Sequence, residues 1–264
     1  MSKIEVIVTG AAGRMGSIIS RLVKEDADMS LVALVEKEEK IKEIGVEADL
    51  CGTSIEEACE AFPSAVIIDF TYPQVTQKNV ETAMAHGNPM VIGTTGLTEE
   101  QMDLLKRAAM RNLIFWAPNM SVGINVLFKI LPMLVDMLGE DYDIEICEIH
   151  HKFKKDAPSG TAVKLAQVLL EAKGWGEDAL TYARKGMIGE RPRKEIGVQT
   201  LRGGDVVGDH NIYLLGPGER LEITHRAHSR ETFARGAIRA TKWLVNRSAG
   251  TLYTMTHMLS NQEI

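Results

Sequence analysis

The sequence predicts an α/β protein in which a doubly wound parallel sheet is followed by a second, α+β region built on a mixed sheet. Short runs rich in β-branched residues alternate five times with segments of helical periodicity. Glycine turns follow the first and fourth of these runs. After residue 120 the pattern changes, because short strands now follow one another across glycine-rich turns.

The first region contains five apolar runs that we interpret as buried strands, at 4–10, 31–36, 65–71, 89–96 and 113–119. Helices are predicted between them. Pro73 suits the first turn of a helix, and Thr98 with Gln101 forms a capping box ahead of a helix over 99–110. The charged segment 37–45 is interpreted as a helix or a loop.

The second region is predicted to begin with a strand at 143–151 and a helix within 159–174, where apolar residues recur at helical spacing. Three further strands are predicted at 196–202, 210–216 and 219–227, and we interpret all three as antiparallel. Residues 230–264 are predicted to be helical.

Composition and charge narrow the function. The formal net charge of −6 argues against a general nucleic-acid partner or a membrane-surface role. The most apolar segment, 126–138, is too short to span a bilayer, and the N-terminal segment does not have the pattern of a signal peptide. The 3 cysteines form no even disulfide framework, which predicts a reducing, cytoplasmic location.

The segment GAAGRMG places Gly10, Gly13 and Gly16 between the first strand and its helix. Such a turn lets backbone N–H groups approach a pyrophosphate at a helix N-terminus. The spacing differs from the usual G-x-G-x-x-G, so an ordinary strand–helix turn remains an alternative. Glu36 ends the second strand, where a carboxylate can bind ribose hydroxyls, and Lys37 can meet a 2′-phosphate. Both NADH and NADPH therefore remain candidates, with a solvated loop as the alternative for these two residues.

Two further segments, GTTG (93–96) and APNMS (117–121), lie at the carboxyl ends of predicted strands. Ligands of open parallel sheets bind at that edge, so small residues there suit a nicotinamide ring. Ordinary turn chemistry is the alternative interpretation.

The segment HHKFKKDAPSGTA (150–162) combines two histidines and three lysines with a predicted helix start. Clustered positive charges favour loss of a proton from one of them, and a helix N-terminus binds anions. We interpret the segment as a pocket for carboxylates with a proton donor beside it. A surface histidine pair followed by a solvated charge run is the alternative, and the histidine spacing does not favour a metal site.

Two other dehydrogenase chemistries are disfavoured. No tyrosine is followed four residues later by lysine, which removes the short-chain dehydrogenase site. A thioester mechanism needs a cysteine nucleophile, but Cys51 and Cys59 come early in the chain and Cys147 lies within a predicted strand. Another dehydrogenase acting on a small dicarboxylate, or a non-enzymatic dinucleotide-responsive binding protein, remains an alternative.

Over nearly its whole length the chain closely resembles the dihydrodipicolinate reductase (4-hydroxy-tetrahydrodipicolinate reductase) family. The segments that carry the resemblance are GAAGRMG, IDFTYP, VIGTTG, APNMSVGIN, EIHHKFKKDAPSGTA and residues 202–240. The resemblance implies a Rossmann-type dinucleotide-binding domain of residues 1–120 completed by 231–264. It implies an inserted domain, 121–230, that binds substrate and forms a homotetramer through its sheet. It also implies NAD(P)H-dependent reduction of 4-hydroxy-tetrahydrodipicolinate in lysine and diaminopimelate biosynthesis.

The resemblance also implies roles for individual residues. His150 is then the acid/base residue and Lys154 the proton donor. The substrate-binding residues are His151, Ser159, Gly160 and Thr161. The cofactor-binding residues are Gly10, Ala11, Ala12, Gly13, Arg14, Met15, Glu36, Lys37, Gly93, Thr94, Thr95, Ala117, Pro118, Asn119 and Met120. No metal is implied. Some relatives carry arginine where this chain has Tyr72, which removes one contact to the adenosine phosphate and leaves the choice between NADH and NADPH open.

Overall fold

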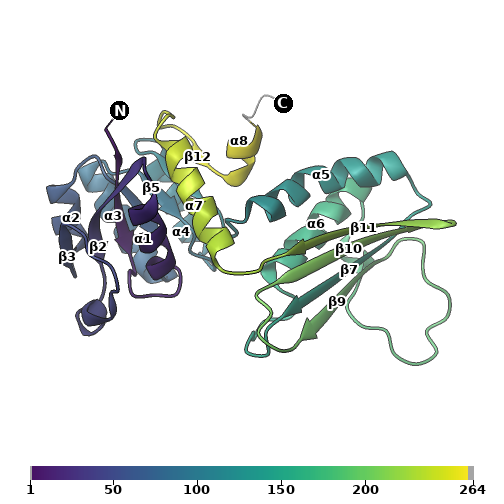
Figure 1. Ribbon diagram of the computed structural model, residues 1–264. Coiled ribbons are helices and arrows are strands. Elements are labelled where there is room, and N and C mark those ends of the chain that lie inside the picture. Colours follow the sequence, from purple (N-terminus) through teal and green to yellow (C-terminus); the bar gives the residue numbers. More distant parts are fainter. Residues whose placement is uncertain (1, 261–264) are drawn as a thin grey trace. The chain divides into compact units, whose positions relative to one another are not determined.

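The computed structural model describes residues 2–260, and these divide into two compact units (Figure 1). Unit 1 contains the described residues up to Val122 and those from Arg230 onward, and unit 2 is Gly123–Ser229. Both changes of unit fall within two residues of the boundaries expected from the sequence. Each unit has its own sheet and its own core.

Unit 1 is built on a parallel sheet of 7 strands in the order β12-β6-β5-β4-β1-β2-β3. Because the order reverses at β1, the carboxyl ends of β1 and its neighbours form a switch point where ligands bind. The strands are β1 (Ile4–Thr9), β2 (Met29–Val35), β3 (Leu50–Gly52), β4 (Val66–Asp69), β5 (Met90–Ile92), β6 (Ile114–Trp116) and β12 (Leu252–Tyr253).

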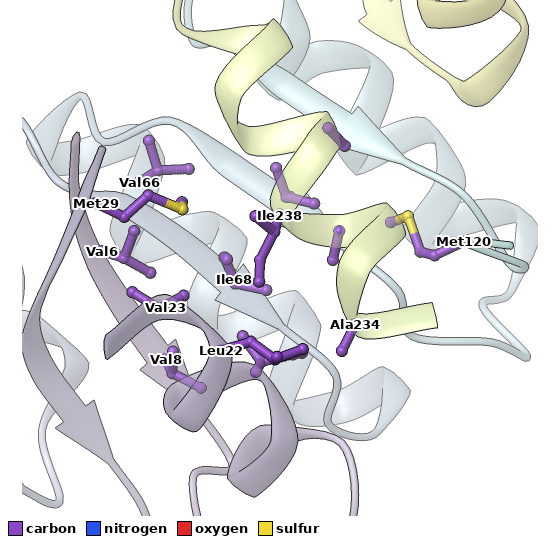
Figure 2. Close-up of a cluster of buried hydrophobic side chains, with 14 of the residues drawn as sticks. Val6, Val8, Leu22, Val23, Met29, Val66, Ile68, Met120, Ala234 and Ile238 are labelled. Atoms are coloured by element: carbon purple, nitrogen blue, oxygen red, sulfur yellow. The ribbon is translucent and has the colours of Figure 1, made fainter. Parts of the chain in front are cut away.

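Helices cover both faces of this sheet, which confirms the doubly wound α/β fold. One face packs against α1 (Gly16–Glu25), α7 (Glu231–Leu244) and α8 (Met255–Ser260). The other packs against α2 (Ile55–Ala61), α3 (Pro73–His86) and α4 (Glu99–Ala109). Successive residues of β1 alternate between the two cores, since Val6 and Val8 face α1 and α7 whereas Ile7 faces the other layer (Figure 2).

The C-terminal helix α7 belongs to unit 1 because it packs beside α1 and on the sheet (Figures 1 and 2). Ala234, Ala237 and Ile238 lie in the same apolar cluster as Val66 and Ile68. The contact is so close at Gly236 that a Cβ atom there would collide with the carbonyl oxygen of Met120.

Several elements of unit 1 differ from the prediction. The capping box of Thr98 and Gln101 is present, and Pro73 does open α3. However, β3 and α2 were not predicted, and β12 lies in a tail predicted to be helical throughout. These strands have three and two residues, too few for a periodic pattern, and they exist because a neighbouring strand offers free hydrogen-bonding groups. The charged segment after β2 forms the 3-10 helix η1 (Glu38–Glu43).

Unit 2 is built on a mixed sheet of 5 strands in the order β11-β10-β7-β9-β8. The strands are β7 (Asp143–His150), β8 (Leu180–Thr181), β9 (Ile196–Arg202), β10 (Asp209–Gly216) and β11 (Glu219–Arg226). As predicted, β10 and β11 are antiparallel to their neighbours. The prediction that the strand at 196–202 is also antiparallel was wrong, because β9 runs parallel to β7. The helix α6 (Gly160–Lys173) carries the chain back along β7 first, and such a crossover makes the next strand parallel.

Two helices, α5 (Val122–Leu138) and α6, cover one face of this mixed sheet (Figure 1). Ile144 and Ile146 of β7 pack under them, together with apolar residues of β9 and β10. The next two inward-facing residues of β7 are Glu148 and His150, and both are buried. The covered face of the sheet therefore changes from apolar to polar along β7. Among the described residues, no helix has both the length and the apolar character needed to cross a membrane.

We predict that Gly236→Ala destabilises unit 1, because the added methyl group forces α7 away from Met120. Overpacking of this kind costs about 1–3 kcal/mol of unfolding free energy. Gly45→Ala is the control, since a Cβ atom at Gly45 meets nothing within 4 Å. Urea unfolding followed by circular dichroism would test this, and equal midpoints for the two variants would contradict the close packing at Gly236.

Candidate active site

The glycine turn between β1 and α1 is held in one conformation by close packing. Gly10 has a φ of 65°, which favours glycine, and the N–H group of Gly13 donates to the carbonyl oxygen of Gly10 over 2.9 Å. A Cβ atom on Gly16 would collide with that same oxygen. The first turn of α1 contains no acidic residue, and its N-cap residue makes no side-chain capping bond. Its N–H groups are therefore suited to a phosphate.

A cavity of about 390 Å³ lies at this switch point. This volume falls within the range of ligand pockets, about 300–1,000 Å³. Six of the residues predicted to bind cofactor line it: Gly10, Gly13, Arg14, Met15, Glu36 and Lys37. Ten more residues that were not assigned to the site also line it: Thr9, Val35, Lys40, Thr53, Ile55, Phe70, Thr71, Tyr72, Val75 and Asn79.

Glu36 is fixed against the glycine turn. Its carboxylate accepts a hydrogen bond from the backbone N–H of Ala12 over 3.0 Å and another from the N–H of Lys37 over 2.9 Å. Lys37 and Lys40 line the same cavity. The residues that line the cavity thus include an acidic residue and two lysines, and acidic and basic side chains distinguish a ribose hydroxyl from a 2′-phosphate.

A second carboxylate, Asp69, accepts hydrogen bonds from residues that line the cavity. It is fully buried at the end of β4 and accepts hydrogen bonds from the N–H and hydroxyl of Thr71 over 2.9 and 2.7 Å. Thr76 and Asn79 of α3 and Thr94 after β5 donate to it over 3.1, 2.6 and 3.1 Å. Asp69 therefore connects the ends of two strands to the first turns of α3.

The other predicted cofactor residues do not line this cavity. Ala11, Ala117 and Met120 are buried, Ala12 is half-buried, and Thr95 and Pro118 are exposed. Thr94 directs its hydroxyl to Asp69, and Gly93 packs against the ring of Phe70 so closely that a Cβ atom would collide with it. The side chain of Asn119 accepts a hydrogen bond from the N–H of Ser121 over 2.9 Å. All of these except the two alanines of the glycine turn follow β5 or β6 at their carboxyl ends.

In unit 2, Glu148 is the centre of a polar cluster. It is fully buried, and its carboxylate lies 2.6 Å from Nδ1 of His150. Arg202 donates to both carboxylate oxygens over 2.8 Å, and the N–H of Ser159 donates over 2.9 Å. Burial alone would raise the pKa of Glu148, but the hydrogen bonds from His150, Arg202 and Ser159 outweigh it and hold this pKa well below its ordinary value. Glu148 is therefore a carboxylate at neutral pH.

His210 extends the cluster from β10. Its ring meets that of His150 edge to face, with 5.3 Å between the ring centroids, and its Nε2 lies 3.1 Å from the hydroxyl of Ser159. Burial, and after it the charge of His150, lower the pKa of His210 to about 3. His210 is therefore neutral at neutral pH.

The basic run after β7 is partly compensated by acidic groups. The ammonium group of Lys154 lies 2.9 Å from the carboxylate of Asp156, and His150 has Glu148. Lys152 lies 5.2 Å from the centroid of the Phe153 ring. Carboxylate partners within the protein were not predicted for this run from the sequence, whereas the structure gives two of its residues one.

The start of α6 contains the residues that were predicted to bind an anion. Ser159 is the N-cap, and its hydroxyl accepts a hydrogen bond from the N–H of Ala162 over 3.1 Å. A Cβ atom on Gly160 would meet nothing within 4 Å, and the backbone there does not require glycine. Neither packing nor conformation therefore explains glycine at this position. Thr161 is half-buried beside it.

Sequence reasoning missed Glu148, Arg202 and His210. One signal was available, because Glu148 lies two residues before His150 and so faces the same side of the strand. The other two residues come from different strands, where β9 places Arg202 beside His150 and β10 places His210 beside Glu148.

We predict that His210 makes the protein less stable at acidic pH. The ordinary pKa of 6.5 applies to the unfolded chain, and the folded value is about 3, so between these values the unfolded chain binds more protons and stability falls as the pH falls. From pH 7 to pH 5 this loss amounts to roughly 2 kcal/mol. His210→Gln should abolish that part of the loss in urea unfolding experiments, while a substitution at the exposed His228 should not. Equal losses in the parent and His210→Gln would contradict the prediction.

Two family models match the chain, and they meet near the first change of unit. A family model described as "Dihydrodipicolinate reductase, N-terminus" matches residues 4–120. A second, "Dihydrodipicolinate reductase, C-terminus", matches residues 123–259. It therefore includes the C-terminal helices that return to unit 1.

Individual proteins are also similar to the chain. The 4-hydroxy-tetrahydrodipicolinate reductase of Oleidesulfovibrio alaskensis is 54% identical, over 97% of this chain and 99% of that protein. That of Nitratidesulfovibrio vulgaris (Miyazaki F) is 54% identical, over 96% of this chain and 98% of that protein. A solved structure of dipicolinate-bound dihydrodipicolinate reductase from Paenisporosarcina sp. TG-14 has a TM-score of 0.77 at 24% identity, covering 96% of this chain and 97% of that one, and supports the fold alone. With both halves matched by the paired family models, the chain belongs to the dihydrodipicolinate reductase family.

Proposed function

We propose that the protein reduces 4-hydroxy-tetrahydrodipicolinate to tetrahydrodipicolinate, with NADH or NADPH as hydride donor, in lysine and diaminopimelate biosynthesis. The observation that carries this proposal is the 54% identity, over 97% of the chain, to a curated 4-hydroxy-tetrahydrodipicolinate reductase. The polar cluster around His150 supplies the acid chemistry that such a reaction needs.

Unit 1 is the cofactor domain in this proposal. The N-terminus of α1, which has no side-chain cap and no acidic residue in its first turn, suits the pyrophosphate, and Glu36 suits the adenosine ribose. The cofactor supplies hydride to the substrate ring. The predicted residues after β5 and β6, such as Gly93 and Asn119, follow strand ends of the same sheet and are assigned to the nicotinamide half.

Unit 2 is the substrate domain. The substrate is a cyclic imine or enamine with two carboxylates, and hydride addition leaves negative charge on its ring. Gly160 and Thr161 at the start of α6, with His151, are assigned to a carboxylate. His150 or Lys154 supplies the proton, and the positive charges beside them stabilise the developing negative charge.

We also propose that the enzyme is a cytoplasmic homotetramer assembled through the sheet of unit 2. Within residues 123–229, both helices longer than one turn pack on the same face of that sheet. The opposite face carries half-buried residues of β7, such as Cys147 and Ile149. Sedimentation equilibrium would check for four chains of 29.1 kDa each. The three free cysteines suit a reducing compartment.

A turnover assay tests the proposed function. The absorbance of the reduced nicotinamide is followed after 4-hydroxy-tetrahydrodipicolinate, the precursor, is added with each cofactor in turn. We expect that NADH and NADPH are both oxidised, and only when the precursor is present. His150→Gln should lower kcat by about a hundredfold or more and leave cofactor affinity nearly unchanged. Tight cofactor binding without turnover would instead support a dinucleotide-responsive binding protein.

A second prediction concerns the carboxylate site. Gly160→Ala should raise KM for the substrate at least about tenfold, since the loss of one hydrogen bond to a charged group costs roughly 1.5–3 kcal/mol. The unfolding midpoint should not fall, because the added methyl group meets no protein atom within 4 Å. Pyridine-2,6-dicarboxylate should compete in the parent and lose potency in the variant. Gly203→Ala is the control, since Gly203 is equally unobstructed, and unchanged inhibition in Gly160→Ala would place the carboxylate elsewhere.

A third prediction concerns the choice of cofactor. Lys37→Ala and Lys40→Ala should each weaken NADPH binding, because both lysines line the same cavity as Glu36 and can meet a 2′-phosphate, and both should spare NADH. Lys42→Ala is the control, since Lys42 belongs to the same 3-10 helix but does not line the cavity. Michaelis constants for both cofactors provide the measurement, and equal losses for NADH and NADPH would argue against this placement of the phosphate.

A further inference from the structure

Glu148 receives hydrogen bonds from three separate segments of unit 2, namely β7, β9 and the start of α6, although its side chain is closed off from solvent. The donors are Nδ1 of His150 at 2.6 Å, both terminal nitrogens of Arg202 at 2.8 Å and the N–H of Ser159 at 2.9 Å. The hydroxyl of Thr200 donates over 3.3 Å. The side chain of Glu148 has a relative exposure of 0%.

This burial is not explained by stability. The two preceding inward positions of β7 hold Ile144 and Ile146, so an apolar residue at 148 would continue the core. A buried ion pair usually stabilises a fold no better than apolar residues of similar volume. The position of the carboxylate, between a histidine and a helix start, therefore points to a role in the site.

We propose that Glu148 is a positioning residue for the reductase reaction, which fixes both the orientation of His150 and the start of α6. The proposal rests on the proposed function, in which His150 handles the proton and α6 binds a substrate carboxylate. A single buried carboxylate then fixes the position of the proton donor relative to the anion site.

The first half of this role is the choice of nitrogen in His150. An ionised carboxylate only accepts hydrogen bonds, so Nδ1 must carry a proton and Nε2 is the nitrogen that gives or takes one. Nε2 faces Gly208, where a Cβ atom would lie 2.9 Å away. The glycine leaves space for the ring in this orientation.

The second half is the link to the anion site. The oxygen of Glu148 that accepts from Ser159 also accepts from Arg202. The same nitrogen of Arg202 donates to the carbonyl oxygen of Asp156 over 2.7 Å. Glu148 and Arg202 together therefore hold both ends of the short segment that leads from the basic run to α6.

The chain offers a matched control in Glu145. It lies on the same strand, on the opposite face of the sheet, and also accepts two hydrogen bonds from one arginine, Arg184, over 2.9 and 2.7 Å. The hydrogen bonds of Glu145 in the described chain come from arginines and not from a histidine. Glu145→Gln thus removes a comparable ion pair without touching His150.

The first experiment compares Glu148→Gln with Glu145→Gln, both with unfolding midpoint and oligomeric mass measured. We expect kcat of Glu148→Gln to fall at least about tenfold, as when the carboxylate that orients a catalytic histidine is replaced by an amide. Its dissociation constant for pyridine-2,6-dicarboxylate should also rise, whereas His150→Gln changes mainly kcat. Glu145→Gln should keep the kcat and the dicarboxylate affinity of the parent. A folded Glu148→Gln variant with parental kcat would overturn the proposal.

The second experiment needs no folded variant at position 148. Nitrogen-15 NMR of the parent, labelled at histidine and assigned by comparison with His150→Gln, reports which ring nitrogen is protonated. We expect neutral His150 to carry its proton on Nδ1, and a proton on Nε2 would overturn the proposal. This result is independent of turnover: a parent that shows the expected tautomer but no reduction of the precursor would refute the proposed function and leave the positioning by Glu148 intact.

Discussion

A carboxylate without water must have its charge matched by donors, and this requirement organises the polar end of unit 2. Glu148 gathers donors from the strand that carries it, from Arg202 on β9 and from the backbone at the start of α6. None of these contacts is replaceable by solvent, because the carboxylate is fully buried. The histidine, the arginine and the helix start are therefore held relative to one another by a single side chain.

Unit 1 uses the same construction at its own ligand edge. Asp69 ends β4 as a fully buried carboxylate, and hydroxyl, amide and backbone donors from three neighbouring segments converge on it. Phe70 and Thr71, which follow it directly, line the cavity. In both units an inner strand thus carries one buried acid at its carboxyl end or two residues before it. The apolar core holds the strands rigidly, and the hydrogen bonds of the buried carboxylate fix the conformation of the loop that follows the strand.

Elements with a strong local signal were predictable from the sequence. The capping box of Thr98 and Gln101, the proline at the start of α3 and the long strands β1 and β2 depend on residues close together in the chain. The direction of β9 and the existence of β3 and β12 were not predictable in this way. They depend on which strand lies beside them, and a partner strand leaves no local pattern in a segment of two or three residues.

The sequence by itself determined the family, the alternating core of unit 1 and the motifs that contain Gly10, His150 and Gly160, because each lies within one continuous segment. Only the tertiary structure decided how the charges of these motifs are matched. Arg202 reaches Glu148 across 54 positions of the chain, and Lys40 and Thr53 join the cavity from segments with no motif of their own. Hydrogen bonds and electrostatic contacts act over a few ångströms in space, so the partners of a buried charge are set by strand order and register and not by distance along the sequence.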